Sequence, residues 1–105
     1  MICSLYFAMA LCFQQPHCYE TVPQKIERMS IERDVNVDDA LRIAECESET
    51  GKNLYNLQGS SAKGIYMFID STWENYCEGN VLSSRDNIAC FLKLYPKYPQ
   101  WWVCK

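Results

Sequence analysis

The chain has 105 residues, of which 49% are hydrophobic and 22% are charged. This length and composition predict one small globular domain and exclude a disordered chain. The net charge is −3 and the lysine and arginine residues are dispersed, so a nucleic acid is not an expected partner.

Seven cysteines in so short a chain are typical of a protein that disulfides stabilise in an oxidising compartment. The cysteines form no C-x-x-C pair and His17 is the single histidine, so a zinc site is not expected. The sequence predicts no other cofactor either. We therefore expect a protein that is secreted or lies in the cell envelope or periplasm.

Residues 1–13 form an apolar stretch that is too short to span a bilayer. They have the length of the hydrophobic part of a secretory signal peptide, with Ala8-Met9-Ala10 as a small-x-small cleavage site. Alternatively, the stretch is a hydrophobic arm that packs on the domain. We assign residues 1–19 to a signal peptide or arm with its connector, and residues 20–105 to the domain. No stable membrane insertion is expected after processing.

Two helices are predicted in the first half of the domain. The first begins at Pro23 and ends near Arg33, as a proline in the first turn favours. The second has Val37 or Asp38 near its N-cap and ends before Gly51. Both follow a helical rather than an alternating hydrophobic pattern.

The second half contains a turn-rich segment and two further helices. Residues 53–69 are two short apolar and aromatic runs around a Gly-Ser turn, which predicts a small β-hairpin. Asp70 or Ser71 can cap a helix over residues 72–77, and a serine at position 83 or 84 can cap a last, longer helix. The predicted fold class is therefore α+β, mostly α.

The second helix carries an anomaly at Glu47. At about 100° per residue, Glu47 falls between Ile43 and Ala44 on the apolar arc of this helix. A carboxylate there must be paired, hydrogen-bonded or protonated, because desolvating the ion alone is costly, and its pKa should rise. One interpretation is a buried glutamate that a nearby cation or N–H group satisfies. The other is a general acid that an apolar wall keeps protonated, as glycosidases require.

Three motifs follow one another along the chain. They are Ile43-Ala-Glu-Cys-Glu-Ser48, Gly59-Ser-Ser-Ala-Lys-Gly-Ile-Tyr-Met-Phe-Ile-Asp-Ser-Thr-Trp73 and Trp102-Val-Cys104. In this order they resemble the lysozyme-like catalytic domain of resuscitation-promoting factors and soluble lytic transglycosylases. The resemblance extends from Pro23 to the C-terminus. It implies a small lysozyme-like fold with a short β-hairpin, and a monomer that acts on the glycan strands of peptidoglycan.

By this resemblance Glu47 is the catalytic acid. In the family this glutamate protonates the oxygen of the β-1,4 bond between N-acetylmuramic acid and N-acetylglucosamine. The transglycosylase branch needs no second catalytic carboxylate, because the substrate's own acetamido and 6-hydroxyl groups assist and an anhydro sugar forms. The sequence agrees, since it offers Glu47 no obvious carboxylate partner.

Further residues near Glu47 are predicted to bind the substrate. They are Ser48, Asn56, Ser61, Tyr66, Met67 and Trp73. Aromatic rings can stack on the apolar faces of sugars, and Tyr66 is the ring most expected in the cleft. Met67 departs from the family, which commonly has a glutamine there, so an amide contact to the sugar is missing.

Two disulfides are predicted. The resemblance, with one cysteine before the glutamate and one after the terminal tryptophan, implies Cys46–Cys104. Cys77 and Cys90 lie at the end of one predicted helix and within the next, near enough in sequence for a local bridge. The bridges would stabilise a domain whose small hydrophobic core supplies little net stability by itself.

Two other functions remain open at this point. The chain can be a catalytically weak or inactive lysozyme-like module that binds glycan, which Met67 and the negative net charge favour. It can also be a small disulfide-rich secreted effector that uses the scaffold for protein contacts. Cleavage of peptidoglycan distinguishes the enzyme from both alternatives.

Overall fold

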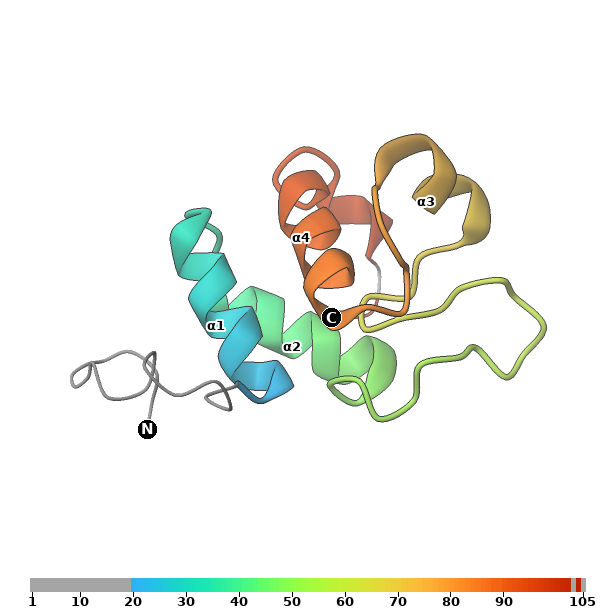
Figure 1. Cartoon of the computed structure of the whole chain (residues 1–105), viewed down its shortest axis with the longest axis horizontal. Helices are drawn as coiled ribbons and strands as arrows, with labels where there is room; N and C mark the ends of the chain where they lie inside the picture. The colour runs from blue at the N-terminus through green and yellow to red at the C-terminus, as the bar shows by residue number, and fades with distance from the viewer. Residues whose placement is uncertain (1–19, 103, 105) are drawn as a thin grey trace.

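The computed structural model describes residues 20–102 and 104 of the chain. These residues form α1 (Val22–Glu32), α2 (Val37–Ser48), α3 (Asp70–Tyr76), α4 (Ser84–Leu94) and a short 3-10 helix, η2 (Pro99–Trp101). Helix α1 contacts both α2 and α4, and the segment between α2 and α3 extends to one side of this group (Figure 1). None of the helices in this part of the chain has the length and hydrophobicity needed to cross a bilayer. The expected signal peptide or hydrophobic arm and its connector, residues 1–19, lie outside the described residues.

The N-cap residues of α1 and α4, Thr21 and Ser83, use their side-chain hydroxyl groups to accept hydrogen bonds from the first turn of the helix. Thr21 Oγ1 accepts a hydrogen bond from the N–H of Gln24, and the Gln24 side chain accepts one from the N–H of Thr21. This reciprocal pair is a capping box, and it fixes the start of α1 one residue before the predicted proline. Ser83 Oγ accepts from the N–H of Asp86 and caps α4, as predicted.

Helix α2 begins slightly earlier than predicted. Its N-cap is Asn36, whose Oδ1 accepts from the N–H of Asp39 at 2.8 Å. The predicted caps, Val37 and Asp38, are instead the first two helical residues. Asparagine takes the cap because its side-chain oxygen satisfies an N–H group of the first turn, which valine cannot do.

Helix α3 also begins earlier than predicted, and without a side-chain cap. Its N-cap is Ile69, and Asp70 is already helical. The prediction that Asp70 caps this helix is wrong, because its carboxylate accepts from Lys63 Nζ at 2.6 Å. The N–H of Asp70 donates to Ser61 Oγ at 3.0 Å. Contacts with the preceding segment therefore replace the predicted local cap.

Residues 53–69 form an irregular excursion, and the predicted β-hairpin is not confirmed. No strand forms in the described residues, and this segment has only two isolated antiparallel bridges, Tyr55 with Lys63 and Lys63 with Phe68. The residues with positive φ in this segment are Gly59, Gly64 and Met67. Positive φ interrupts an extended backbone, so the two arms cannot pair along their length.

The hydrophobic core lies among α1, α2 and α4 and includes Ile65, Tyr66 and Phe68 of the excursion. Its larger buried side chains are Ile26, Met29, Ile43, Ile65, Tyr66, Phe68, Ile88, Phe91, Leu92 and Trp102. Asn87 of α4 holds the excursion against this core, because its Oδ1 accepts from the N–H of Tyr66 at 2.8 Å. Gly64 must be glycine here, since a Cβ atom would lie 2.1 Å from Asn87 Nδ2.

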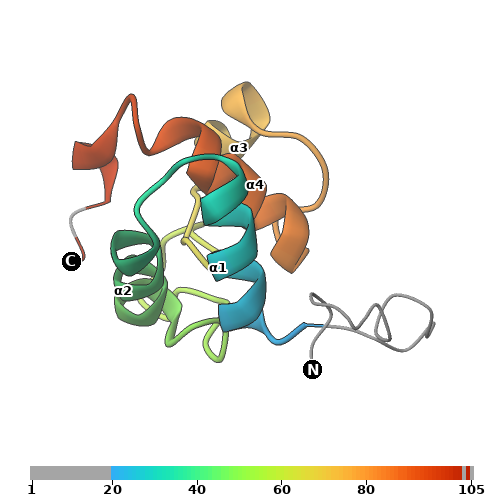
Figure 2. The same cartoon turned by 90° about the vertical axis from the view of Figure 1, so that its left-hand side faces the viewer.

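Two disulfides link residues that are 58 and 13 positions apart in the sequence, and both have the predicted pairing. Cys46–Cys104 joins α2 to the C-terminal segment, and Cys77–Cys90 joins the end of α3 to α4. Their Cα–Cα distances, 5.7 and 5.6 Å, are ordinary for disulfides. The C-terminal segment consequently ends beside α2 (Figure 2).

Candidate active site

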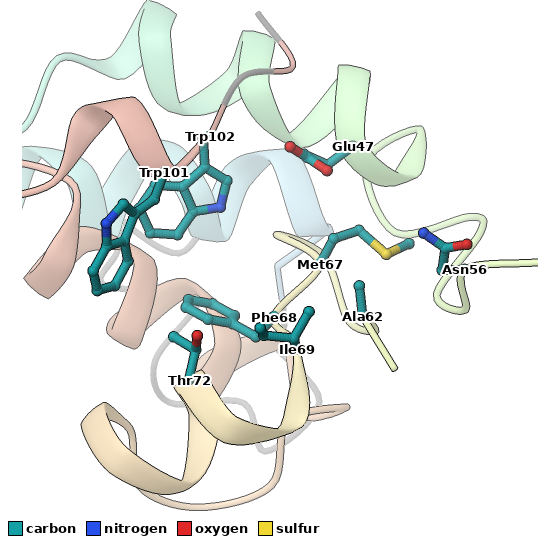
Figure 3. A pocket seen from close by; sticks show the side chains of 9 residues that line it. All are labelled: Glu47, Asn56, Ala62, Met67, Phe68, Ile69, Thr72, Trp101 and Trp102. Carbon is teal, nitrogen blue, oxygen red and sulfur yellow. The ribbon is translucent and has the colours of Figure 1, made fainter. Parts of the chain in front are cut away.

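A pocket of about 430 Å³ opens beside the end of α2 (Figure 3). Its lining comes from α2, the excursion, the start of α3 and the C-terminal segment. The lining residues are Glu47, Asn56, Ala62, Met67, Phe68, Ile69, Thr72, Trp101 and Trp102. Glu47 is the one charged residue among them, Asn56 and Thr72 are polar but uncharged, and the others are apolar or aromatic. The wall around the Glu47 carboxylate is therefore mostly apolar.

Glu47 lies in the last turn of α2, and its carboxyl group points into the pocket (Figure 3). The fully buried residues of this helix include Ile43, Ala44 and Ser48, whereas Glu47 is only half-buried. The sequence placed Glu47 in the middle of the apolar arc, and the structure places the pocket in front of that arc at the helix end. The Glu47 side chain, which the helical pattern directs toward the core, therefore faces the pocket instead.

The pocket wall changes the acidity of Glu47. Desolvation by burial raises the pKa of its carboxyl group above the ordinary range. No ion pair or hydrogen bond from residues 20–102 or 104 opposes this shift. The alternative of a structurally paired glutamate thus finds no partner in the described part of the chain. The arrangement suits a carboxyl group that holds its proton and can donate it.

Asn56 and Met67 line the pocket, as predicted for substrate-binding residues. Asn56 Oδ1 accepts from the N–H of Gln58 at 2.7 Å, so its NH₂ group remains for a ligand and faces the pocket in Figure 3. The Met67 side chain extends toward Asn56 across the pocket (Figure 3). Met67 has φ of 52°, which is unusual for a residue with a side chain, and the turn directs its thioether into this space.

Tyr66 and Ser48 do not line the pocket, and the prediction that Tyr66 lies in the cleft is wrong. Tyr66 is fully buried, its ring stacks on Phe91, and its hydroxyl donates to the Ala40 carbonyl at 2.7 Å. Burial also raises the pKa of this hydroxyl strongly. Ser48 is 1% exposed, and its hydroxyl donates to the Ile65 carbonyl at 2.8 Å. Both side chains join α2 to the excursion instead of meeting a ligand.

Ser61 and Trp73, also predicted to bind substrate, serve the neighbouring structure. Ser61 Oγ accepts the hydrogen bond from the N–H of Asp70. The Trp73 indole donates to the Gly79 carbonyl at 3.1 Å, and its ring packs edge-on against Phe68. Neither residue is part of the pocket lining.

Trp101 and Trp102 also line the pocket, although neither was predicted from the sequence as a substrate-binding residue. Trp102 is 4% exposed, and its indole N–H donates to the Tyr66 carbonyl at 2.9 Å. Trp101, in contrast, is 41% exposed at the pocket. A usable signal existed, because the predicted Cys46–Cys104 disulfide places the residues before Cys104 beside Glu47.

A second pocket, of about 670 Å³, lies beside the Cys77–Cys90 disulfide. Arg33, Lys93, Glu78 and Asp86 line it, so its charges are mixed. Asp86 accepts from the N–H of Asn80 at 2.9 Å in this region and is not a second carboxylate for Glu47. Within the described ranges, no cluster of three His, Cys, Asp or Glu residues could hold a metal ion.

Comparisons of the chain with protein-family models, with curated proteins and with solved structures find no match.

Proposed function

We propose that this chain is a peptidoglycan-cleaving glycosidase, either a lytic transglycosylase or a muramidase, with Glu47 as the general acid. The bond cleaved is the β-1,4 bond between N-acetylmuramic acid and N-acetylglucosamine. The observation that carries the proposal is the isolated Glu47 carboxyl in a pocket with an apolar and aromatic wall. Burial raises its pKa, as proton donation to a glycosidic oxygen requires.

In the proposed reaction, the Glu47 proton passes to the glycosidic oxygen while the bond between that oxygen and C1 of the muramic acid breaks. The N-acetylglucosamine side leaves as an alcohol, and the acetamido group of the substrate stabilises C1. The 6-hydroxyl then bonds to C1 and returns a proton to the Glu47 carboxylate. The part of the lining that the structure describes has no second carboxylate, which supports this route over one with an Asp or Glu nucleophile.

A glycan-binding module without catalysis is the second candidate. Met67 favours it, because its thioether lines the pocket at a position where the transglycosylases that the sequence resembles commonly have a glutamine amide. Binding would then use the Asn56 NH₂ group and the aromatic wall, and Glu47 would contribute polarity only. The two candidates differ in whether bonds in the glycan break.

Mass spectrometry of peptidoglycan after incubation with the protein tests the proposal. We expect muropeptides with anhydro ends from a transglycosylase, or with reducing ends from a muramidase. Glu47→Gln keeps the shape of the side chain but removes the acid, so the rate should fall by about 10²-fold or more. The variant should fold, because a glutamine side chain has the same shape and is neutral at every pH, so no charge has to be desolvated in the pocket.

Glu45→Gln is the matched control on the same helix. Glu45 is exposed and accepts from the Thr50 hydroxyl at 2.6 Å, a bond that a glutamine oxygen can also accept. Its activity should equal that of the wild type. Wild-type cleavage rates in Glu47→Gln would remove the assignment of Glu47 as the acid. If the wild type leaves the glycan intact, the proposed enzyme is contradicted and the glycan-binding module is the remaining candidate.

A further inference from the structure

Three aromatic side chains form an exposed cluster at one end of the pocket, which we call the aromatic platform (Tyr76, Tyr98 and Trp101). Trp101 is 41% exposed and Tyr76 is 43% exposed. The Tyr98 and Trp101 rings stack with centroids 4.2 Å apart and an interplanar angle of 7°. Tyr76 meets Trp101 edge-on at 5.4 Å. So much exposed aromatic surface beside a pocket is typical of a binding site.

The surrounding structure fixes the orientation of Trp101. Tyr98 covers one face of the indole, and the N–H of Trp101 donates to the Tyr98 carbonyl at 3.0 Å within the turn of η2. The next residue, Trp102, is anchored in the core, and the Cys46–Cys104 disulfide follows. The uncovered surface of Trp101 is therefore held ready at the pocket, with little conformational entropy left for a ligand to remove.

Trp101 and Asn56 lie at opposite ends of the pocket, and Glu47 lies between them (Figure 3). A glycan chain that presents a bond to Glu47 has sugar rings on both sides of that bond. One of these rings is thus directed toward Asn56 and another toward Trp101. Thr72, which lines the pocket on α3, supplies a hydroxyl on the same side as Trp101 in Figure 3.

We propose that Trp101 forms a second sugar subsite, at which it stacks on the apolar face of an N-acetylhexosamine ring beyond the cleaved bond. The inference rests on the proposed function for the kind of ligand. A pyranose ring fits because it combines an apolar C–H face with hydroxyl groups at its edge, and this end of the pocket combines an aromatic face with a hydroxyl group. Among the described residues, Glu47 is the one charged side chain in the pocket lining, and the side chains at this end of it are aromatic, apolar or hydroxylic, which suits a neutral sugar ring.

Titration with a tetrasaccharide of β-1,4-linked N-acetylglucosamine tests the subsite independently of cleavage. The indole N–H signals of the chain's three tryptophans can be followed by NMR in the full ¹⁵N-labelled protein. The Trp101 signal should shift on binding. The Trp73 signal should not, because that indole donates to the Gly79 carbonyl outside the pocket lining. A shift of Trp73 without a shift of Trp101, or no binding, would overturn the inference.

Variants then measure the contribution of the ring. Trp101→Ala should weaken tetrasaccharide binding by about 10-fold, whereas Trp101→Tyr, which keeps an aromatic face, should stay within about 3-fold of the wild type. Ile31→Ala on α1 removes another exposed apolar side chain and should leave the affinity unchanged. Unchanged affinity in Trp101→Ala would overturn the subsite even if the wild type cleaves peptidoglycan. Weakened binding together with an absence of cleavage would overturn the proposed catalysis and keep the subsite.

Discussion

The wall of the pocket that carries Glu47 and the wall that carries Asn56 are held in very different ways. The first wall is part of α2, and the Cys46–Cys104 disulfide and the hydrogen bond from Trp102 to Tyr66 secure the segment beside it. The second wall is a loop in which Leu57 is 93% exposed. The hydrogen bond from the N–H of Asn56 to the Ala62 carbonyl is among the few contacts that hold it.

This contrast indicates a division of tasks. A proton donor needs a fixed position relative to the bond that it attacks, and helices that pack in a core provide such positions better than loops. A loop with few buried contacts opens at a lower free energy and can adjust to a ligand. We therefore expect changes in the Glu47 wall to have large effects and changes in the Asn56 wall to have small ones.

The largest effect is expected from removing the Cys46–Cys104 disulfide by a double Cys46→Ser and Cys104→Ser substitution. The bridge spans a sequence separation of 58, for which chain entropy gives about 4 kcal/mol of stability. Denaturant unfolding measures this loss. Tetrasaccharide binding by the folded variant should weaken by about 10-fold as well, as in Trp101→Ala, because Trp101 is no longer held beside Glu47.

A double Cys77→Ser and Cys90→Ser substitution is the matched control. This bridge spans a separation of 13 and contributes about 3 kcal/mol, but it lies outside the Glu47 pocket. Stability should fall while binding is retained at a temperature where the variant is folded. Equal binding in the two double variants would show that the disulfide does not secure the wall.

The next effect is the pH dependence of activity and stability that the protonation of Glu47 causes. Because burial raises the pKa of this carboxyl, its protonated form persists to higher pH than in an unfolded chain. Above that pKa, the rate of peptidoglycan cleavage should fall about tenfold per pH unit. The stabilising contribution of the bound proton is present below the ordinary pKa of a glutamate, and it is lost as the pH rises through the raised pKa.

Unfolding of the wild type and of Glu47→Gln between about pH 4 and about pH 8 measures this linkage. The wild type should lose stability relative to the variant as the pH rises. A difference that stays constant with pH, or that moves in the other direction, contradicts the desolvation of Glu47.

A smaller effect is expected at Met67, which lies in the pocket between the two walls. Met67→Gln adds donors and an acceptor without a large change in volume, so tetrasaccharide binding should tighten by a few-fold. Met67→Leu is the control, because it has a similar volume and no amide, and its affinity should match the wild type. If the two variants bind equally, position 67 does not hydrogen-bond the sugar.

The smallest effect is expected in the loop wall. Leu57→Ser should change the free energy of unfolding by no more than about 0.5 kcal/mol, because the leucine side chain is 93% exposed. Ile43→Ala in α2 removes a fully buried side chain and should cost about 2–5 kcal/mol. Thermal unfolding of both variants compares the two walls directly, and a large loss for Leu57→Ser would mean that the loop makes contacts in solution that stabilise it.

Features that depend on local spacing could be predicted from the sequence. The position of Glu47 between Ile43 and Ala44 follows from the helical period, and the two serines before the last apolar run predict a cap at position 83 or 84, of which the structure has Ser83. Ser48 could have been excluded on the same ground, since it follows Ala44 by four residues on the buried side of α2.

Features that depend on distant partners could not be predicted. A tyrosine suits both a core and a sugar site, and the partners that hold Tyr66 in the core are distant in the sequence: its ring stacks on Phe91, and its hydroxyl donates to the carbonyl of Ala40. The predicted hairpin, which is not confirmed, also lies in a segment with a distant partner, because Asn87 of α4 accepts the hydrogen bond from the N–H of Tyr66. The resemblance to lytic transglycosylases directed attention to residues beside Glu47 and away from Trp101, which the Cys46–Cys104 disulfide brings to the pocket.

The pocket exists only in the folded chain, since its lining comes from positions as distant as Glu47 and Trp102 and includes a residue of the core. Any ligand that occupies the pocket must therefore stabilise the folded chain by mass action. At a free ligand concentration of about 100 times the dissociation constant, the free energy of unfolding rises by about 2.7 kcal/mol and the melting temperature rises with it. For a domain of this size that is roughly 10 °C or more. A thermal-shift screen of sugars can thus rank occupants of the pocket whether or not any bond is cleaved.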